Sequence, residues 1–491
     1  MSFTPKYSRS YTPIKTIIEE ATSLLETTVI VAGFIKSVRQ QFLRLTDGSY
    51  IHGIQLVFPE ELSGLLTDLK TGGSIKATGI VKTPPDSSKE VVEIHVTSVE
   101  HIGKVYDPIT YPFAKKGHTL AHIRDYPHLR QRLDFQQAIS RIAHELDMAI
   151  HQYYDSIGLI HYRTPCLTSS DCEGAGEVLC ATTLVKTDSK EIPTVKDSSL
   201  IDFTKDLFGK AVYLTVSGQL HGETATCSGS GVGGIYTFGP TFRAEGSQTS
   251  RHLAEFWMIE PELRFVELDD VISVAEDTIK SALARVLDKC SSELDFLDSF
   301  HKLISKETGL SADRMKLKDK LERIVSADFH RVRYSTAWEQ LKAVESEAHF
   351  SVPITPFMDF QAEHEKYLVD VVYKGYPVVV THYPKEIKAF YMKEDATDPT
   401  YVQSFDVLVP GVGELIGGSI REDSYEKLMG RITERKMDPT PLEYYLDLRK
   451  MGTVPHGGFG IGFERLIMWV TEMPSIRDVI PFPRYGGRCD C

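Results

Sequence analysis

The sequence lacks long apolar runs, paired cysteines and an excess of basic residues, and each absence excludes a class of protein. No run of 18 apolar residues occurs in the 491-residue chain, which excludes an ordinary membrane-spanning helix. The seven cysteines show no paired zinc-site spacing apart from Cys489 and Cys491, so we expect reduced thiols in a reducing compartment. The formal net charge of −13 argues against a generally basic nucleic-acid-coating protein, although RNA binding needs only a local basic surface.

One such basic stretch lies at residues 115–132, where a single acid, Asp125, stands among five cations and three histidines. The cations are Lys115, Lys116, Arg124, Arg130 and Arg132. This stretch is either a contact surface for nucleic acid or the solvated face of a linker.

The N-terminus lacks the apolar core of a secretory signal. Its first 18 residues carry Lys6, Arg9 and Lys15 but no acid, a pattern that fits a transit peptide or a disordered basic tail. We expect a cytoplasmic protein, with the mitochondrial matrix as the alternative compartment.

The first part of the chain is β-rich. After an N-terminal extension of residues 1–27, residues 28–106 contain five short strand candidates separated by turn residues. The candidates are residues 28–34, 42–45, 53–57, 74–81 and 91–96. This pattern predicts a small barrel of the OB type, with an SH3-like barrel as the alternative, followed by an irregular hinge at 107–132.

A larger domain is expected over residues 133–491. Five apolar residues recur at helical spacing and predict one buried helix face: Phe135, Ile139, Ile142, Leu146 and Ile150. A short strand then leads to Pro165. Residues 265–345 are helical in pattern and charged, as expected of an insertion, and strands are expected again at 367–372, 378–382 and 405–409.

Two segments point to a nucleotide site. In residues 241–256, Arg243 and Glu245 are expected on one strand face, and Arg251, His252 and Phe256 on the returning strand. In residues 458–465, glycines at 458, 460 and 462 predict a strand face without side chains, followed by Arg465 at a helix start. A flat slot beside arginine and phenylalanine suits a planar ring, and further cations suit a polyphosphate, so the pair predicts an ATP site on an antiparallel sheet.

The two segments resemble motifs 2 and 3 of the class II aminoacyl-tRNA synthetases. The resemblance implies that Arg243 stabilises the α-phosphate of ATP, that Glu245 binds the adenine amino group, and that Arg251 and His252 hold the outer phosphates. Phe256 and Arg465 would enclose the ring above Gly462, which makes Arg243 and Arg465 the catalytic candidates.

The resemblance also implies a metal site and a dimer. An Asp and a Glu that bind Mg²⁺ in this family correspond to Asp406 and Glu414. The helix, strand and Pro165 resemble motif 1, which forms the homodimer interface in the family.

Within the class, the chain is most similar to the asparaginyl family of subclass IIb, whose members carry an N-terminal OB fold that reads the anticodon. The similar segments are residues 169–177, 214–220, 251–262, 384–392, 409–419, 447–449 and 455–484. The implied fold is α+β: a class II antiparallel sheet with flanking helices, preceded by a small all-β OB-fold barrel. The implied partners are L-asparagine and tRNA(Asn).

The amino-acid preference follows from one position. Aspartyl enzymes place a lysine where this chain has Gly222, and Glu223 follows. A carboxylate without that lysine repels aspartate and accepts the asparagine amide NH₂, while Arg421 donates to the amide oxygen. Glu173 and Gln219 are the candidates for binding the α-ammonium group.

By the same resemblance, Arg39, Phe42, Gln55 and Glu93 are the candidate anticodon contacts, with Phe42 stacking on a splayed base. Three positions depart from the family pattern: Gly246, Gln248 and His382 stand where asparagine is expected. The alternatives are an aspartyl enzyme and a synthetase paralogue that does not charge tRNA.

Overall fold

The structure, a computed structural model, describes residues 7–88, 90–113, 117–170, 178–185, 192–244, 249–311 and 313–491. The chain divides into two compact units. The first comprises Met1–Arg141, Ser292–Ala312 and Cys491, and the second comprises Ile142–Ser291 and Asp313–Asp490.

The first unit contains the expected barrel, which is closed by five strands in the order β1-β2-β3-β5-β4. The strands are β1 (Thr28–Arg39), β2 (Phe42–Thr46), β3 (Ile54–Val57), β4 (Ser74–Lys82) and β5 (Glu93–Gly103). Side chains of β4 alternate between buried and half-buried positions, because successive residues of a strand point to opposite faces. The inward residues form one apolar core, which confirms the prediction of a small all-β barrel.

Short helices accompany this barrel. They are α1 (Ile14–Glu19), α2 (Ala21–Leu24), the 3₁₀ helix η1 (Glu60–Thr67), α3 (Leu120–Arg124) and α4 (Pro127–Arg130). The last two lie in the segment that we expected to be irregular. Two long helices also contribute: α5 (Asp134–Ser156) begins in the first unit and ends in the second, and α8 is Ser291–Thr308. All five apolar residues predicted to form one face of α5 are buried.

The second unit is built on an eight-stranded sheet in the order β11-β12-β13-β14-β15-β10-β9-β6. Its strands are β6 (Leu159–His161), β9 (Gly234–Phe242), β10 (Glu255–Arg264), β11 (His330–Arg333), β12 (Val378–Thr381), β13 (Ser404–Val409), β14 (Gly413–Ile420) and β15 (His456–Gly462). Neighbours are antiparallel except at the two edges, where β11–β12 and β6–β9 are parallel. The expected antiparallel sheet is therefore confirmed.

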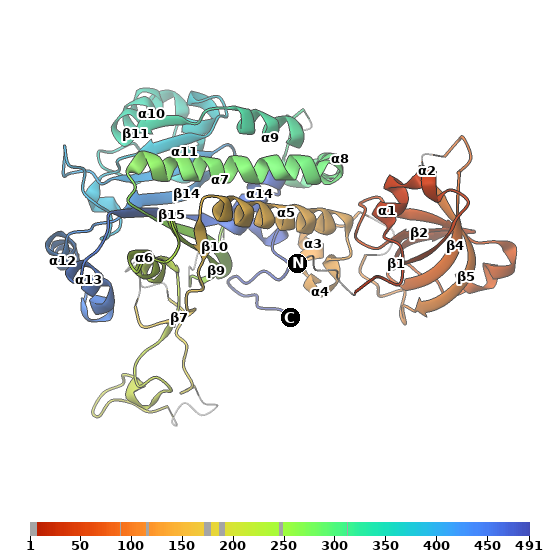
Figure 1. The fold of residues 1–491 in the computed structure, drawn as a ribbon, viewed down its shortest axis with the longest axis horizontal. Coiled ribbons are helices and arrows are strands. Elements are labelled where there is room, and N and C mark those ends of the chain that lie inside the picture. The colour runs from red at the N-terminus through yellow and green to blue at the C-terminus, as the bar shows by residue number, and fades with distance from the viewer. Residues whose placement is uncertain are drawn as a thin grey trace. The chain divides into compact units, whose positions relative to one another are not determined.

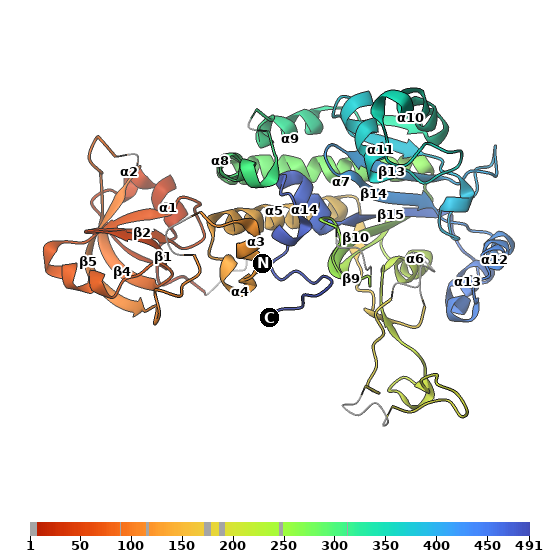
Figure 2. The same ribbon diagram turned by 180° about the vertical axis from the view of Figure 1, so that it is seen from behind.

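Helices flank this sheet. They are α6 (Gln219–Cys227), α7 (Leu268–Lys289), α9 (Leu317–Ser326), α10 (Tyr334–Ala348), α11 (Ala362–Tyr367), α12 (Tyr425–Glu434), α13 (Glu443–Lys450) and α14 (Phe463–Thr471). Helix α7 runs across one face and contacts β14 and β15 (Figure 1), and Figure 2 shows the sheet from the opposite side. Short 3₁₀ helices complete the unit: η3 (Phe203–Lys205), η5 (Lys385–Ile387), η6 (Thr440–Leu442) and η7 (Ile476–Asp478).

One expectation for this unit is wrong. Residues 367–372 are not a strand, because they form the end of α11 and the π-helix η4 (Leu368–Val372). The segment 265–345 is largely helical, as expected, and also supplies the edge strand β11.

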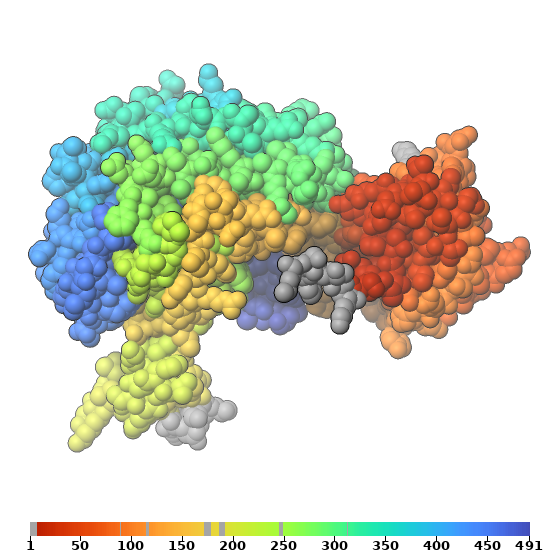
Figure 3. Space-filling model, in the orientation of Figure 1, coloured from red at the N-terminus to blue at the C-terminus, as the bar shows by residue number. Residues whose placement is uncertain are grey.

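Two further strands, β7 (Leu167–Thr168) and β8 (Tyr213–Leu214), pair with each other and frame an excursion that projects from the body of the second unit (Figure 3). Within the described ranges, no helix combines the length and apolar character needed to cross a membrane.

Candidate functional site

Two cross-strand rows organise one face of the sheet. Residues directly opposite each other on neighbouring strands point to the same face. The first row, across β13, β14 and β15, is Asp406, Gly417 and Gly460. The second row, across β14, β15 and β10, is Ser419, Gly458 and Glu262. Each row therefore brings one carboxylate and at least one glycine to this face.

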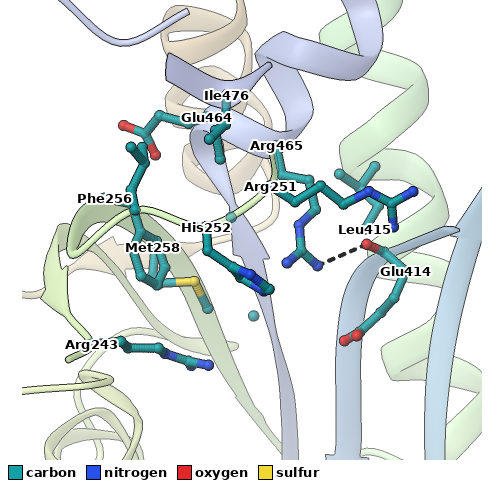
Figure 4. Close-up of a pocket in the computed structure, with 13 residues that line it drawn as sticks. Arg243, Arg251, His252, Phe256, Met258, Glu414, Leu415, Glu464, Arg465 and Ile476 are labelled. Carbon is teal, nitrogen blue, oxygen red and sulfur yellow. Dashed lines mark hydrogen bonds between the residues drawn. The ribbon is translucent and has the colours of Figure 1, made fainter. Parts of the chain in front are cut away.

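A cavity of about 300 Å³ opens beside these rows (Figure 4). Every candidate ATP residue in the described part of the chain lines it: Arg243, Arg251, His252, Phe256, Glu414, Gly462 and Arg465. Glu245 lies outside the described residues. The predicted strand positions need correction, because Arg243 follows the last residue of β9, and Arg251 and His252 precede β10.

The cavity gathers cations. The guanidinium of Arg243 lies 5.6 Å from the centre of the Phe256 ring. Arg465 donates to the backbone carbonyl oxygen of Glu414 at 2.9 Å. Burial and the nearby Arg465 lower the pKa of Arg251. Because the positive charges of Arg251 and Arg465 repel each other, a polyanion bound between them would stabilise both.

The glycine-lined slot is shorter than expected. A Cβ on Gly458 would lie 2.5 Å from Glu262 Oε1, and one on Gly460 would lie 2.7 Å from Met258 Cε. The expectation of an open strand face is therefore wrong at Gly458. At Gly462 the nearest atom to such a Cβ is the Cβ of Arg465, at 3.6 Å, and Gly462 lines the cavity.

A second cavity, of about 220 Å³, adjoins the first. Four residues line both cavities: Arg243, Met258, Glu414 and Gly460. Three further predicted residues, Gln219, Asp406 and Arg421, line the second one. Lys388 and Tyr391 also line it and were missed, although both lie in the segment 384–392 that carried the family resemblance.

Arg421, which lines the second cavity, is fixed by three hydrogen bonds. It donates to Glu262 through Nε at 3.2 Å and through Nη2 at 2.5 Å, and to Ser419 Oγ at 2.7 Å. Burial raises the pKa of Glu262 to about 7, and the nearby Glu223 carboxylate adds to that rise while Arg421 opposes it.

Glu223 does not line the cavity. It lies on α6 with its side chain fully buried, and its Oε1 is 3.8 Å from Arg421 Nε. The same Oε1 accepts a hydrogen bond of 3.0 Å from Nε2 of Gln219, which does line the cavity. The other amino-acid candidate, Glu173, lies outside the described residues.

The two candidate metal ligands converge over a glycine. A Cβ on Gly417 would lie 2.9 Å from Glu414 Oε1 and 3.4 Å from Asp406 Oδ1. Lys388 donates to the other oxygen of Asp406 at 2.6 Å. Burial and Glu414 raise the pKa of Asp406 to about 6, although Lys388 opposes the rise.

These oxygens fit a hard divalent cation that takes most of its remaining ligands from phosphates and water. Among the described residues, no group of three or more acids, histidines or cysteines is arranged to hold a metal alone. Sequence reasoning missed a third nearby carboxylate, Glu365, which accepts from the backbone N–H of Glu414 at 3.1 Å. Burial and Glu414 raise its pKa to about 7.

On the barrel of the first unit, the four anticodon candidates lie on one face, although Glu93 is itself buried. Arg39 stands opposite Phe42, and Gln55 stands opposite Glu93. Arg44, two residues after Phe42 and opposite Gln55, links the two pairs on the same face. Gln55 Nε2 donates to Glu93 at 3.1 Å, and His95 lies 2.8 Å from the same carboxylate.

The family model of tRNA synthetases class II (D, K and N) matches residues 121–486. The asparagine--tRNA ligase of Photobacterium profundum is 43% identical over 483 residues, which cover 97% of this chain and 98% of that protein. The corresponding ligase of Protochlamydia amoebophila is 41% identical over 478 residues, 96% of this chain and 97% of that protein.

Solved structures agree. Asparaginyl-tRNA synthetase from Pyrococcus horikoshii, complexed with asparaginyl-adenylate, superposes with a TM-score of 0.79 at 31% identity, covering 95% of this chain and 97% of that one. The Entamoeba histolytica enzyme with the same ligand gives 0.75 at 26%, covering 96% and 98%. The motifs, the sheet and these matches together confirm that the chain belongs to the class II tRNA synthetases (D, K and N) and is an aminoacyl-tRNA synthetase.

Proposed function

We propose that the chain is an asparagine-activating enzyme that forms asparaginyl-adenylate and pyrophosphate from L-asparagine and ATP, then transfers asparagine to the 3′ end of tRNA(Asn). The observation that carries the proposal is the position of Arg243, which lines both cavities. A carboxylate in one cavity and a triphosphate in the other meet at this guanidinium. The choice of amino acid is supported by relatives named asparagine--tRNA ligase, which match this chain over nearly their full length.

Adenylate formation is an in-line attack of the substrate carboxylate on the α-phosphate. Negative charge grows on the α-phosphate oxygens in the transition state, and Arg243 stabilises it there. Arg251 and His252 hold the β- and γ-phosphates. Phe256 and Arg465 enclose the adenine ring against Gly462, and Glu245 accepts from the adenine amino group.

Asp406 and Glu414 would hold Mg²⁺, which when bound would supply positive charge beside the departing pyrophosphate. Lys388 keeps Asp406 oriented by binding only one of its oxygens.

Asparagine lies in the second cavity. Gln219, with Glu173, binds the α-ammonium group, and Arg421 donates to the side-chain amide oxygen. Glu223 lies directly behind Gln219 and Arg421, which line the cavity, and we assign the amide NH₂ to its Oε1, the oxygen that faces these two residues. An aspartate carboxylate would oppose Glu223 with like charge, which disfavours its binding.

The barrel surface of Arg39, Phe42, Gln55 and Glu93 reads the anticodon of tRNA(Asn). We further propose a homodimer and a cytoplasmic location. The six cysteines in the described ranges carry no disulfide, which is consistent with a reducing compartment.

The test is ATP–pyrophosphate exchange with each of the twenty amino acids, with Glu223→Gln beside the unmodified protein. We expect exchange with asparagine alone and impaired exchange in the variant. Exchange driven by aspartate would replace the proposal with an aspartyl enzyme. Folded protein that exchanges with no amino acid would instead indicate a paralogue that does not charge tRNA.

A further inference from the structure

Behind the amino-acid cavity lies a buried cluster of charged side chains that the activation chemistry leaves unexplained. Its centre is Glu223, whose Oε2 receives three contacts. Tyr445 donates through its hydroxyl at 2.7 Å, Arg449 donates through Nη2 at 2.8 Å, and His456 Nε2 lies at 2.9 Å. The side chains of Glu223, Arg449 and His456 are all fully buried.

Arg449 is held in place for this contact. Its Nε donates to the backbone carbonyl oxygen of Glu422 at 3.0 Å, and its Nη2 also donates to the Tyr445 hydroxyl at 2.9 Å. The guanidinium lies 4.0 Å from the centre of the Tyr445 ring. Because arginine does not lose its proton in proteins, this is a permanent positive charge at one oxygen of Glu223.

The two oxygens of Glu223 therefore have separate environments. Oε2 points to Arg449 and its neighbours, away from the cavity, and Oε1 points to Gln219 and Arg421, which line it. We propose that Arg449 is a positioning residue that keeps Glu223 ionised and thereby makes the site prefer asparagine over aspartate. This inference rests on the proposed function, in which Glu223 accepts from the asparagine amide.

The chemistry of a carboxyl group explains the effect. An ionised Glu223 can only accept hydrogen bonds, so it pairs with the amide NH₂ and repels a second carboxylate. A protonated Glu223 carries a hydroxyl donor, so it can bind an aspartate carboxylate. Burial raises the pKa of Glu223, but His456, Arg449 and Arg421 together outweigh it and hold the pKa below its usual value.

Other groups around Glu223 also carry charge or titrate. They are Arg421, Glu262, Tyr445, His456 and Cys227. Val454 O lies 2.7 Å from His456 Nδ1, and Glu223 Oε2 and Arg449 Nη2 lie 2.9 and 3.5 Å from its Nε2. These groups are present in every Arg449 variant. An effect that appears when the Arg449 charge is removed, and not when it is kept, is therefore due to that charge.

The experiment measures kcat/KM for asparagine and for aspartate in ATP–pyrophosphate exchange, at pH 6.5 and pH 8.5. Arg449→Gln should lower the asparagine-to-aspartate ratio by at least ~10-fold at pH 6.5, with partial recovery at pH 8.5 as Glu223 ionises again. Arg449→Lys retains the charge and should keep most of the ratio. Arg431→Gln is the matched control, because Arg431 is a buried arginine on α12 bonded to Glu434 and Lys385.

A folded Arg449→Gln protein with the unmodified ratio at both pH values would overturn the inference, and so would an equal loss in Arg431→Gln. If the unmodified protein does not activate asparagine, the proposed function falls, and this inference falls with it. If Arg449→Gln does not fold, the double variant Glu223→Gln/Arg449→Gln decides. Removing both charges should restore folding if Arg449 serves to pair Glu223, and continued failure to fold would contradict that pairing.

Discussion

The guanidinium of Arg465 donates a hydrogen bond of 2.9 Å to the backbone carbonyl oxygen of Glu414, although 51 residues separate them in the chain. The bond joins the start of α14 to the start of β14. Arg465, proposed to cover the adenine ring, and Glu414, proposed to hold the metal, are therefore joined directly by a hydrogen bond. Their relative position is set before either ligand binds, which is the preorganisation that phosphoryl chemistry requires.

Replacing Arg243 tests the junction of the two cavities. Arg243→Gln should lower kcat for ATP–pyrophosphate exchange by about 100- to 1000-fold, because charge that develops in the transition state loses its donor. The matched control is Arg264→Gln, on the same hairpin, whose guanidinium donates to the backbone carbonyl oxygens of Thr226, Gly229 and Val232. Equal losses in the two variants would contradict a catalytic role for Arg243.

Replacing Asp406 tests the metal site. Asp406→Asn should raise the Mg²⁺ concentration needed for half-maximal exchange by about 10-fold or more, since one of two protein ligands loses its charge. Mn²⁺ binding in the presence of ATP, followed by electron paramagnetic resonance, should weaken in parallel. Asp398→Asn, at an exposed turn where Asp398 accepts from Thr400, is the control. An unchanged Mg²⁺ requirement would remove Asp406 from the site.

Gly458 is expected to be irreplaceable for a steric reason. A Cβ there would lie 2.3 Å from the backbone oxygen of Pro261 and 2.5 Å from Glu262 Oε1. Gly458→Ala should lower the free energy of unfolding by about 1–3 kcal/mol, as overpacking does, and weaken asparagine binding by displacing Glu262 from Arg421. Gly430→Ala, on α12 with open space around its position, should instead stabilise the protein by about 0.4–1 kcal/mol. Urea unfolding measures both values.

Phe42 tests anticodon reading separately from catalysis. Phe42→Ala should raise the KM for tRNA by about 10-fold, because loss of base stacking costs about 1–3 kcal/mol, while exchange without tRNA stays unchanged. Phe34→Ala removes another barrel phenylalanine, which packs against Arg132 in the first unit. If the two variants lower charging equally, stacking at Phe42 is not specific.

Glu464 predicts a pH dependence of stability. Burial raises its pKa to about 7, above the usual 4.5, so the folded state binds this proton more tightly than the unfolded chain. The ionised carboxylate therefore destabilises the fold above about pH 7, and this penalty disappears as the pH falls toward 4.5. Glu464→Gln, which can still accept from the Trp257 N–H, should stabilise the protein at pH 8 by about 1–3 kcal/mol and little at pH 5. A stability difference that does not change with pH would refute this.

One departure from the family pattern gains a physical reason from the backbone. His382, where asparagine is expected, has a φ of +57°. Asparagine, aspartate and histidine are the non-glycine residues that most readily adopt this left-handed conformation. The side chain is further held by Asp395, 3.3 Å from its Nε2. The substitution therefore keeps the turn before Pro384.

The wrong strand at residues 367–372 shows where local pattern fails. Its valines and leucine favour a strand by propensity, yet the segment is helical. Two carboxylates hold this region against β14 and the turn before it: Glu365 of α11 accepts from Glu414 N–H, and Asp370 accepts from Gly411 N–H. These tertiary contacts outweigh a propensity difference of about 1 kcal/mol or less.

The sequence by itself determined the barrel, the buried face of α5 and the family, because side-chain periodicity and long motifs are local properties. It also identified most residues of the ATP cavity. Only the tertiary structure decided that Gly458 accommodates Glu262, that Glu223 lies behind the cavity, and that Arg449 meets it from 226 positions away. Those relations depend on strand register and helix packing, which bring distant residues within hydrogen-bond distance and which no local pattern encodes.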